Sequence, residues 1–342
     1  MINLGRFRAF ANSPIQYSAL TIELLQSSTA IDMLGLLTLD YRKFTGWAHQ
    51  PERFAPPDFA LLKASGINVF HPAVGFDRGD IYAASLADIT AWNTFLAAHP
   101  DQFLRIGTPR DLDRVKASGK IGIVLGQQNS AHFRTVGDVD RFYQMGQRVS
   151  QLTYDANRLG SGCTSLKDTG LTDFGGSVVE RMNALGMAID VSHCGDRTTL
   201  DAIGASRKPV LVTHSNCRAL VPMSARCKTD EAIRRLASTG GVFGVTMIRF
   251  FVRSSGAATL EDMLDHVDRV ARLTGVEHVG IGSDVDLVGH APNSNADLQG
   301  IEYQKKFFAI TEGLVRRKYN ADQIRMIIGA NFQRALSQIW SA

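Results

Sequence analysis

The stretch that decides the fold runs from Ala188 to Ser215 and reads AIDVSHCGDRTTLDAIGASRKPVLVTHS. A short apolar run leads to His193, a helical pattern follows, and a second apolar run leads to His214. Apolar runs that do not alternate with polar residues are typical of parallel strands covered on both faces. The stretch therefore predicts two strands joined by a helix, with a histidine close behind each strand.

The same unit recurs along the chain. Helical patterns alternate with eight apolar runs, at residues 30–33, 67–71, 121–125, 150–153, 188–191, 210–213, 242–247 and 279–282. This alternation predicts an α/β fold, a (β/α)8 TIM barrel. An open doubly wound sheet is the alternative, but it normally carries a glycine-rich phosphate loop after its first strand, and MLGLL at 33–37 is not one. We expect residues 1–28 to form an N-terminal extension that packs on a single barrel domain, residues 29–342.

Three of the predicted helices have clear start signals. Each is preceded by a threonine, namely Thr108, Thr172 and Thr259. After Thr108 and Thr259 an aspartate stands three residues later, which makes a capping box. Gly186 is placed to end the helix that follows Thr172. These signals put helices between the strands, as a barrel requires.

Composition and charge exclude several classes of protein. Of the 342 residues, 44% are hydrophobic and 20% charged, which is ordinary for a folded domain. The 37 Lys and Arg against 33 Asp and Glu give a net charge of +4 without a cationic stripe, so we expect no nucleic-acid partner. No apolar run approaches the roughly 20 residues that span a bilayer, and the N-terminus lacks a signal-peptide pattern. Four cysteines without a C-x-x-C pair indicate reduced thiols, so we expect a cytoplasmic protein without a membrane partner.

Polar residues follow three of the predicted strands. His193, His214 and Asp284 come after the fifth, sixth and eighth strands. The carboxyl ends of barrel strands meet on one face, so we expect these side chains to lie close together. Imidazole and carboxylate groups are the usual ligands of zinc, and the same groups can serve as acid and base without metal. His71, after the second strand, is the other histidine placed to face this site, although a structural role for it is favoured.

Two further polar residues have competing interpretations. Arg226 lies in the loop after the sixth strand. An isolated arginine is usually solvated, but one above a barrel mouth can bind a substrate carboxylate through a bidentate pair. His266 lies within the helical pattern at 260–273 and is predicted to have a packing or surface role.

The order of motifs in the second half of the chain resembles the membrane (renal-type) dipeptidase family. The resemblance is strong from about Gly122 to the C-terminus. Its motifs are GLTDFG from Gly170, VVERMNALGM from Val178, DVSH ending at His193, THSN from Thr213, GGV from Gly240, HVGIGSD ending at Asp284, and IGANF from Ile328. The resemblance implies a (β/α)8 barrel of the metal-dependent hydrolase type. It also implies two zinc ions and cleavage of dipeptides, often with a D-residue on the C-terminal side.

Several of the family's site residues carry over by position. His193 and His214 match the two histidines of one metal site. Asp284 matches the aspartate that holds the other metal and moves protons, and Arg226 matches the arginine that receives the substrate carboxylate. Tyr154 stands where the family has a substrate-facing histidine after strand four.

Other family positions are changed. The family begins its barrel with His-x-Asp, and both residues bind metal; here Leu34 and Leu36 take their places. The family's metal-bridging glutamate ends strand three, where this chain reads LGQQN at 125–129. Gln127 offers only a weaker amide oxygen, and Asp155 is a nearby carboxylate that could compensate. A complete two-metal centre needs the bridging carboxylate, so the sequence predicts one zinc ion rather than two.

Three functions remain open on this evidence. The first is a metallodipeptidase or amidase that uses one zinc ion on a small substrate bearing a carboxylate. The second is a lyase or isomerase that acts on an amino-acid derivative with acid and base groups. The third is a binding protein without catalysis. The resemblance also allows a homodimer, although no dimer surface can be recognised in the sequence.

Overall fold

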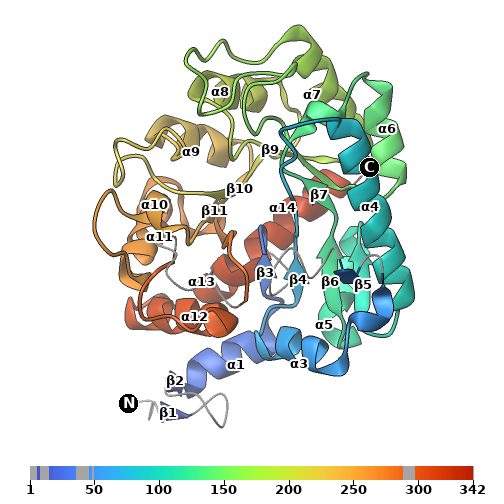
Figure 1. Ribbon diagram of the computed structural model, residues 1–342. Coiled ribbons are helices and arrows are strands. Elements are labelled where there is room, and N and C mark those ends of the chain that lie inside the picture. The colour runs from blue at the N-terminus through green and yellow to red at the C-terminus, as the bar shows by residue number, and fades with distance from the viewer. Residues whose placement is uncertain (1–5, 8–14, 36–45, 48–49, 288–296, 342) are drawn as a thin grey trace.

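The computed structural model describes residues 6–7, 15–35, 46–47, 50–287 and 297–341 (Figure 1). Its centre is a ring of parallel strands surrounded by helices. In chain order the ring contains β3 (Ile31–Asp32), β4 (Val69–Phe70), β6 (Ile121–Val124) continued by β7 (Gly126–Gln127), β8 (Val149–Gln151), β9 (Ala188–Asp190), β10 (Leu211–Ser215), β11 (Val242–Val245) and β12 (Val279–Ile281). The eight predicted strands are all present.

The first and last strands of the ring lie side by side. The amide of Met33 donates to the carbonyl oxygen of Ile281 over 3.0 Å, and Gly35 forms a parallel bridge with Val285. On the other side, β6 pairs with β4 and β7 pairs with β8, so the two segments act as one bent strand. The fold is therefore the TIM-barrel-like α/β fold that the alternating pattern predicts.

Helices follow the strands and cover the outside of the ring. They are α1 (Ala19–Ser27), α3 (Pro56–Ala64), α4 (Ile81–Ala98), α5 (Pro109–Ser118), α6 (Gly137–Gln144), α7 (Asp173–Leu185), α8 (Asp196–Ala205), α9 (Asp230–Ser238), α10 (Arg249–Val252), α11 (Leu260–Thr274), α12 (Lys306–Arg316), α13 (Ala321–Arg325) and α14 (Asn331–Trp340). No described helix is both long and apolar enough to cross a membrane.

The predicted capping signals are confirmed. Thr108, Thr172 and Thr259 each accept a backbone N–H at the start of α5, α7 and α11. Gly186 ends α7 with a φ of 78°, the left-handed region that glycine adopts without strain. His266 on α11 is fully buried and bonded to backbone, as expected of a packing residue. All four cysteines are free thiols.

Three of the described strands were not predicted from the sequence. β5 (Phe103–Ile106) pairs with β6 along its whole length as an edge strand. Its sequence, FLRI, contains an arginine and buries only its two end residues, so it lacks the continuous apolar pattern of the ring. β1 (Arg6–Phe7) and β2 (Tyr17–Ser18) form a short antiparallel pair. After β2, the backbone N–H of Ser18 and the hydroxyl of Thr21 donate to Glu312 on α12, which fastens α1 to the barrel.

Helix α14 closes the amino-terminal end of the ring. One buried cluster unites inward-facing strand residues such as Ala188 and Leu211 with Phe332 and Leu336 of α14. The Phe332 ring lies where a side chain on Gly280 would stand, 2.3 Å from its ideal Cβ position. This end of the barrel is therefore filled by side chains, and a substrate must approach the carboxyl ends of the strands.

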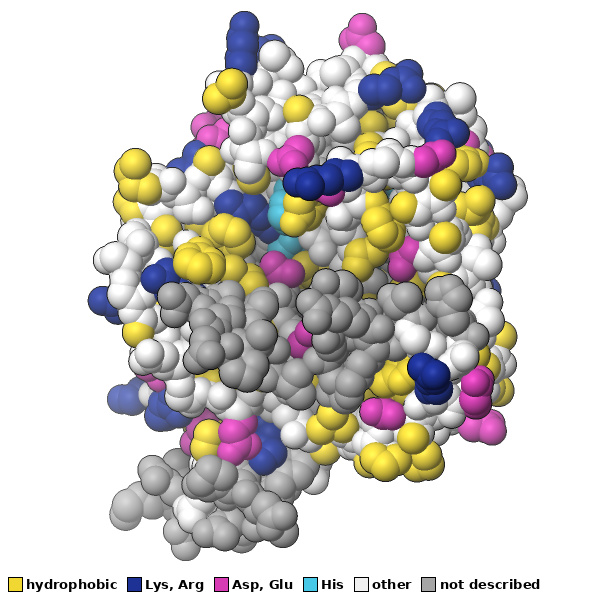
Figure 2. All heavy atoms as spheres, viewed as in Figure 1, with side chains coloured by type: hydrophobic (Ala, Val, Ile, Leu, Met, Phe, Trp, Pro, Cys, Tyr) yellow, Lys and Arg dark blue, Asp and Glu magenta, His cyan; other side chains and the backbone are white. Residues whose placement is uncertain are grey.

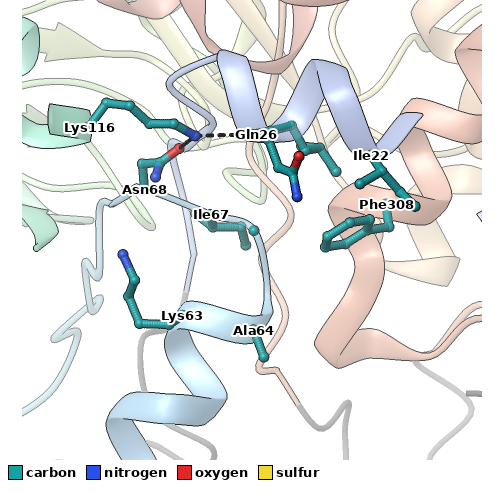
Figure 3. Close-up of a pocket in the computed structure, with 10 residues that line it drawn as sticks. Ile22, Gln26, Lys63, Ala64, Ile67, Asn68, Lys116 and Phe308 are labelled. Atoms are coloured by element: carbon teal, nitrogen blue, oxygen red, sulfur yellow. Dashed lines mark hydrogen bonds between the residues drawn. The ribbon is translucent and has the colours of Figure 1, made fainter. Parts of the chain in front are cut away.

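A hollow of about 340 Å³ lies on the outside of the barrel near its filled end (Figure 3). Lys63 and Lys116 line it, together with apolar side chains of α1 and α12. Both lysines donate to carbonyl groups at the C-terminal ends of helices. Lys63 Nζ donates to Gly119 O after α5 over 2.7 Å. Lys116 Nζ donates to Leu25 O in the last turn of α1 over 2.8 Å. These contacts are typical of lysines at helix C-termini, and the hollow is separate from the predicted histidine site.

Candidate active site

The two predicted histidines meet at the carboxyl ends of β9 and β10. Nε2 of His193 lies 3.1 Å from Nε2 of His214. His214 is fully buried, whereas His193 is partly exposed. Figure 2 shows histidine side chains in a recess of this face, beside cationic and acidic groups. Burial, reinforced by the charge of Arg226, holds the pKa of both imidazoles well below the usual range, so both are neutral at neutral pH.

A carboxylate behind the pair determines which nitrogen of His214 carries the proton. The Thr213 hydroxyl donates to Asp190 Oδ2 over 2.7 Å. Its oxygen therefore accepts from Nδ1–H of His214, 2.8 Å away, and Nε2 keeps its lone pair. Asp190 also accepts from the hydroxyl and amide of Ser192. The sequence analysis did not identify Asp190 and Thr213 as site residues. Asp190 begins the motif DVSH that ends in His193, and Thr213 begins the motif THSN that contains His214.

Tyr154 stacks on the exposed side of this pair. Its ring lies 4.3 Å from the His193 ring, with an angle of 23° between the planes. Burial raises the pKa of Tyr154, and the charge of Asp284 adds to the effect. Gly75 permits the stack, because a Cβ there would lie 2.6 Å from the Tyr154 ring. The neighbouring Asp155 is exposed and accepts a hydrogen bond from Thr164, a residue of the same loop.

Two buried cations lie beside the histidines. Arg226 donates from Nη1 to Ser192 O over 2.6 Å and from Nη2 to His214 O over 2.7 Å. Its Nε–H is buried without a hydrogen-bond partner among the described residues. Lys228, which sequence reasoning missed, donates to Cys194 O over 2.6 Å, and burial lowers its pKa to about 8. These charges disfavour protonation of the histidines and favour an anion near them.

Asp284 lies at the end of β12 in a backbone conformation that few residues adopt. Its φ is 59°, and its amide donates to Leu34 O over 2.7 Å. The carboxylate is partly exposed, and its charge contributes to the raised pKa of Tyr154. Leu34, in the place of the family's first ligand, is fully buried. Leu36 lies outside the described residues.

A buried ion pair lies under this part of the rim. Lys306 Nζ lies 3.2 Å from Asp32 Oδ2 and donates to Ser283 Oγ over 2.7 Å. Ser283 in turn donates from its hydroxyl to Asp32 over 2.6 Å. All three side chains are fully buried, so the carboxylate of the first strand is neutralised from within the protein.

Gln127 and the neighbouring Gln128 both donate from their amide nitrogens to neighbouring elements. Gln127 donates from Nε2 to Asp88 on α4 over 2.8 Å. Burial raises the pKa of that aspartate to about 7. Gln128 donates to Ala73 O over 2.8 Å. Both amides are therefore bonded to neighbouring elements of the ring.

The histidine pair fits two ligands of one metal ion. At zinc–nitrogen distances of about 2.0–2.1 Å, nitrogens 3.1 Å apart subtend an angle of roughly 100°, close to tetrahedral. Second-shell bonds of the kind made by Thr213 and Asp190 are typical of metal-bound histidines. Leu34, at the position of the family's first ligand, offers no ligand atom. Among the described residues, no group of three or more His, Cys, Asp or Glu side chains is arranged to hold a metal.

Comparison with known proteins agrees with the fold and the motifs. The family model described as membrane dipeptidase (peptidase family M19) matches residues 61–342. The dipeptidase verJ of Clonostachys rogersoniana is 30% identical over 260 residues, which cover 75% of this chain and 65% of that protein. An uncharacterized dipeptidase of Schizosaccharomyces pombe is 32% identical over 225 residues, 64% of this chain and 53% of that protein. The chain thus spans about half to two thirds of the length of these curated relatives.

Solved structures show the same architecture. An amidohydrolase from Pseudomonas aeruginosa is 27% identical, with a TM-score of 0.80 over 94% of this chain and 99% of that one. A metallo peptidase from Rhodobacter sphaeroides, liganded with a phosphinate mimic of L-Ala-D-Ala, is 19% identical and has a TM-score of 0.76 over 92% of this chain and 99% of that one. The family match covers most of the sequence and includes both histidines. This chain belongs to the membrane dipeptidase family, peptidase family M19.

Proposed function

We propose that this chain is a hydrolase that cleaves a dipeptide or a similar small amide with the help of one zinc ion. The observation that carries the proposal is the facing pair of Nε2 atoms on His193 and His214, 3.1 Å apart. The tautomer of His214 leaves its Nε2 lone pair free for an ion, since Thr213 and Asp190 hold the proton on Nδ1. Membership of a family described as dipeptidases supports hydrolysis as the reaction.

His193 and His214 would hold the ion, and the position of Asp284 after β12, which matches the family's metal-binding aspartate, makes it the candidate for a third ligand. When bound, the ion would polarise the scissile carbonyl group and lower the pKa of a bound water. In hydrolysis, the water oxygen bonds to the carbonyl carbon and the C–N bond breaks. The Asp284 carboxylate would take a proton from the water and return it to the leaving nitrogen.

The remaining residues would bind the substrate. The buried Nε–H of Arg226 has no partner among the described residues, so it would pair with a substrate carboxylate while the Nη atoms hold the backbone behind the histidines. Tyr154 would contribute an aromatic surface and keep the His193 ring in place. Gln127 and Asp155 would support the rim through their contacts with Asp88 and Thr164.

A lyase or isomerase that uses its own acid and base groups is the second candidate. The observation in its favour is the fully buried, apolar Leu34 in the place of a metal ligand. Neutral imidazoles beside a tyrosine are also a complete set of acid–base groups without metal. The two candidates differ in their need for an ion.

Elemental analysis of protein purified without chelator or metal-affinity resin tests the proposal. We expect close to one zinc per chain and hydrolysis of some member of a panel of L,L- and L,D-dipeptides. About two ions per chain would contradict the single site. No ion and no hydrolysis, even after zinc, cobalt or manganese is added, would exclude the hydrolase and favour the second candidate.

A further inference from the structure

The turn after β12 contains a residue in an uncommon backbone conformation. Asp284 has a φ of 59°, in the left-handed region that residues other than glycine rarely adopt. Aspartate tolerates this region better than most residues, but the conformation still costs free energy and persists only where the surrounding structure holds it. Asp284 is partly exposed, whereas Ser283 and Val285 on either side of it are fully buried. The turn thus exposes a carboxylate between two buried residues.

The first strand of the barrel holds the amide groups of this turn. The amide of Asp284 donates to Leu34 O over 2.7 Å. The amide of Ser283 donates to Asp32 Oδ1 over 2.8 Å, and the Ser283 hydroxyl donates to Oδ2 of the same carboxylate. Both atoms that enter the left-handed residue from its amino-terminal side are therefore fixed by β3 and the residues that follow it.

Lys306 reaches the same turn from the start of α12. Its Nζ donates to Ser283 Oγ over 2.7 Å and to Val285 O over 2.7 Å. The third acceptor is Asp32 Oδ2, 3.2 Å away. An ammonium group has three N–H donors, so each hydrogen has one acceptor here. One buried ammonium group therefore holds the residues on both sides of Asp284.

The helix that carries Lys306 gives no reason for a cation at this place. Lys306 opens α12, and the helix dipole disfavours a positive charge in the first turn. Its side chain is fully buried, which is rare for lysine unless the charge is paired. The preceding Lys305 instead lies 2.7 Å from Glu302, in the segment before the helix. The contacts of Lys306 with the turn, rather than the helix, therefore account for its position.

We propose that Lys306 is a positioning residue for the reaction. Its ammonium group, balanced by Asp32, clamps residues 283 and 285 and so keeps Asp284 in the left-handed conformation that presents its carboxylate for proton transfer. The inference rests on the proposed function in giving Asp284 that proton transfer; the clamp itself does not depend on it. Asp32 takes part because an unpaired ammonium group would not be stable in a fully buried place.

The test compares three variants with the wild type. Lys306→Met removes the ammonium group and keeps a long side chain. The double variant with Asp32→Asn removes both charges, so that no unpaired charge is buried. Lys305→Met is the matched control, the same change one residue earlier in a lysine that is paired with Glu302. Crystal structures, unfolding in urea, and kcat and KM on the best dipeptide at saturating zinc are measured for each.

We expect residue 284 to leave the left-handed region in both Lys306 variants. In both, kcat should fall about 100-fold, the loss that a displacement of about 1 Å can cause. KM should stay within about twofold, because Arg226 would still bind the substrate carboxylate. Lys305→Met should keep the kcat of the wild type. The double variant should regain stability without regaining kcat, whereas a merely structural ion pair would let both return together.

Three results would overturn the proposal. They are an unchanged conformation of residue 284 in either folded Lys306 variant, a kcat within about twofold of the wild type in either, and a kcat that recovers with stability in the double variant. If Lys306→Met does not fold, the double variant alone decides. If the wild type neither binds zinc nor cleaves dipeptides, the proposed function fails, and the conformation of residue 284 in the crystal structures alone decides whether the clamp exists.

Discussion

The two halves of the barrel rim differ in what they do with a buried carboxylate. On the β9–β10 side, Asp190 is bonded to hydroxyl and amide groups and, through Thr213, orients His214 toward the recess. On the β3–β12 side, Asp32 is paired with the ammonium group of Lys306. One carboxylate orients a functional imidazole, and the other is neutralised inside the protein.

The two sides of the rim therefore offer different groups to a ligand. The charge of the Asp32 carboxylate is balanced by the ammonium group of Lys306. Leu34, which is also buried, contributes neither charge nor a ligand atom. The imidazoles of the other half are neutral and face each other. The rim thus has two facing imidazoles on one side and a buried ion pair on the other.

The largest effect is expected from His214→Ala, which removes one nitrogen of the facing pair. Bound zinc and dipeptide hydrolysis should both fall below detection, because a single histidine does not hold the ion at micromolar protein concentration. The control is His278→Ala, a half-buried histidine at the amino end of β12 whose ring donates from Nδ1 to Gly241 O. Zinc and activity that survive in His214→Ala would remove the histidine pair from the site.

The second effect concerns the other half of the rim. Lys306→Met leaves Asp32 buried without its cation, so the free energy of unfolding should fall by about 3–5 kcal/mol. Urea unfolding measures it, and Lys120→Met, a lysine at the surface, should change stability by less than about 1 kcal/mol. The double variant with Asp32→Asn should recover part of the loss. Equal losses in the two single lysine variants would show that the ion pair has no special role.

A smaller effect should follow from cutting the link between Asp190 and His214. Thr213→Val keeps the shape of the side chain but removes the hydroxyl, so zinc affinity should drop about 10- to 100-fold, as for other second-shell changes. Thr213→Ser should restore most of the affinity. Competition with a coloured zinc chelator gives the numbers, and an unchanged affinity in Thr213→Val would show that the hydroxyl does not orient the ring.

The smallest effect is a pH dependence at Lys228 on the histidine side. Its pKa is lowered to about 8 in the folded chain and returns to about 10.4 on unfolding, so between these values the unfolded state binds more protons. Stability should therefore rise with pH, by about 1 kcal/mol from pH 8 to 9. The difference in unfolding free energy between wild type and Lys228→Met isolates this contribution. A difference that does not change over this range would contradict the lowered pKa.

Much of the architecture was predictable because its signals are local. Every barrel strand overlaps one of the eight predicted segments, and the threonines before α5, α7 and α11 cap these helices as expected. The edge strand β5 was not predictable from its pattern, because only its first and last residues are buried. Among the site residues, the meeting of His193 and His214 followed from the barrel rule that strand ends converge.

Other contacts depend on closure of the ring. Asp32 and Lys306 are 274 positions apart, and nothing near either residue marks them as partners. Gln127 was expected at the substrate, but its position on the strand directs the amide to Asp88 on α4. Nε2 of His71 has no partner among the described residues, and the ring takes the space that a side chain at Gly126, on a neighbouring strand, would fill.

The sequence by itself determined the strand and helix pattern, the family, and the two histidines, because periodicity, caps and motifs are properties of neighbouring residues. The tertiary structure alone decided which carboxylate orients an imidazole, which is paired with a lysine, and which buried polar atoms have a partner. The physical reason is that the protonation and pairing of a buried group depend on atoms brought together from distant strands, and barrel closure determines which atoms those are.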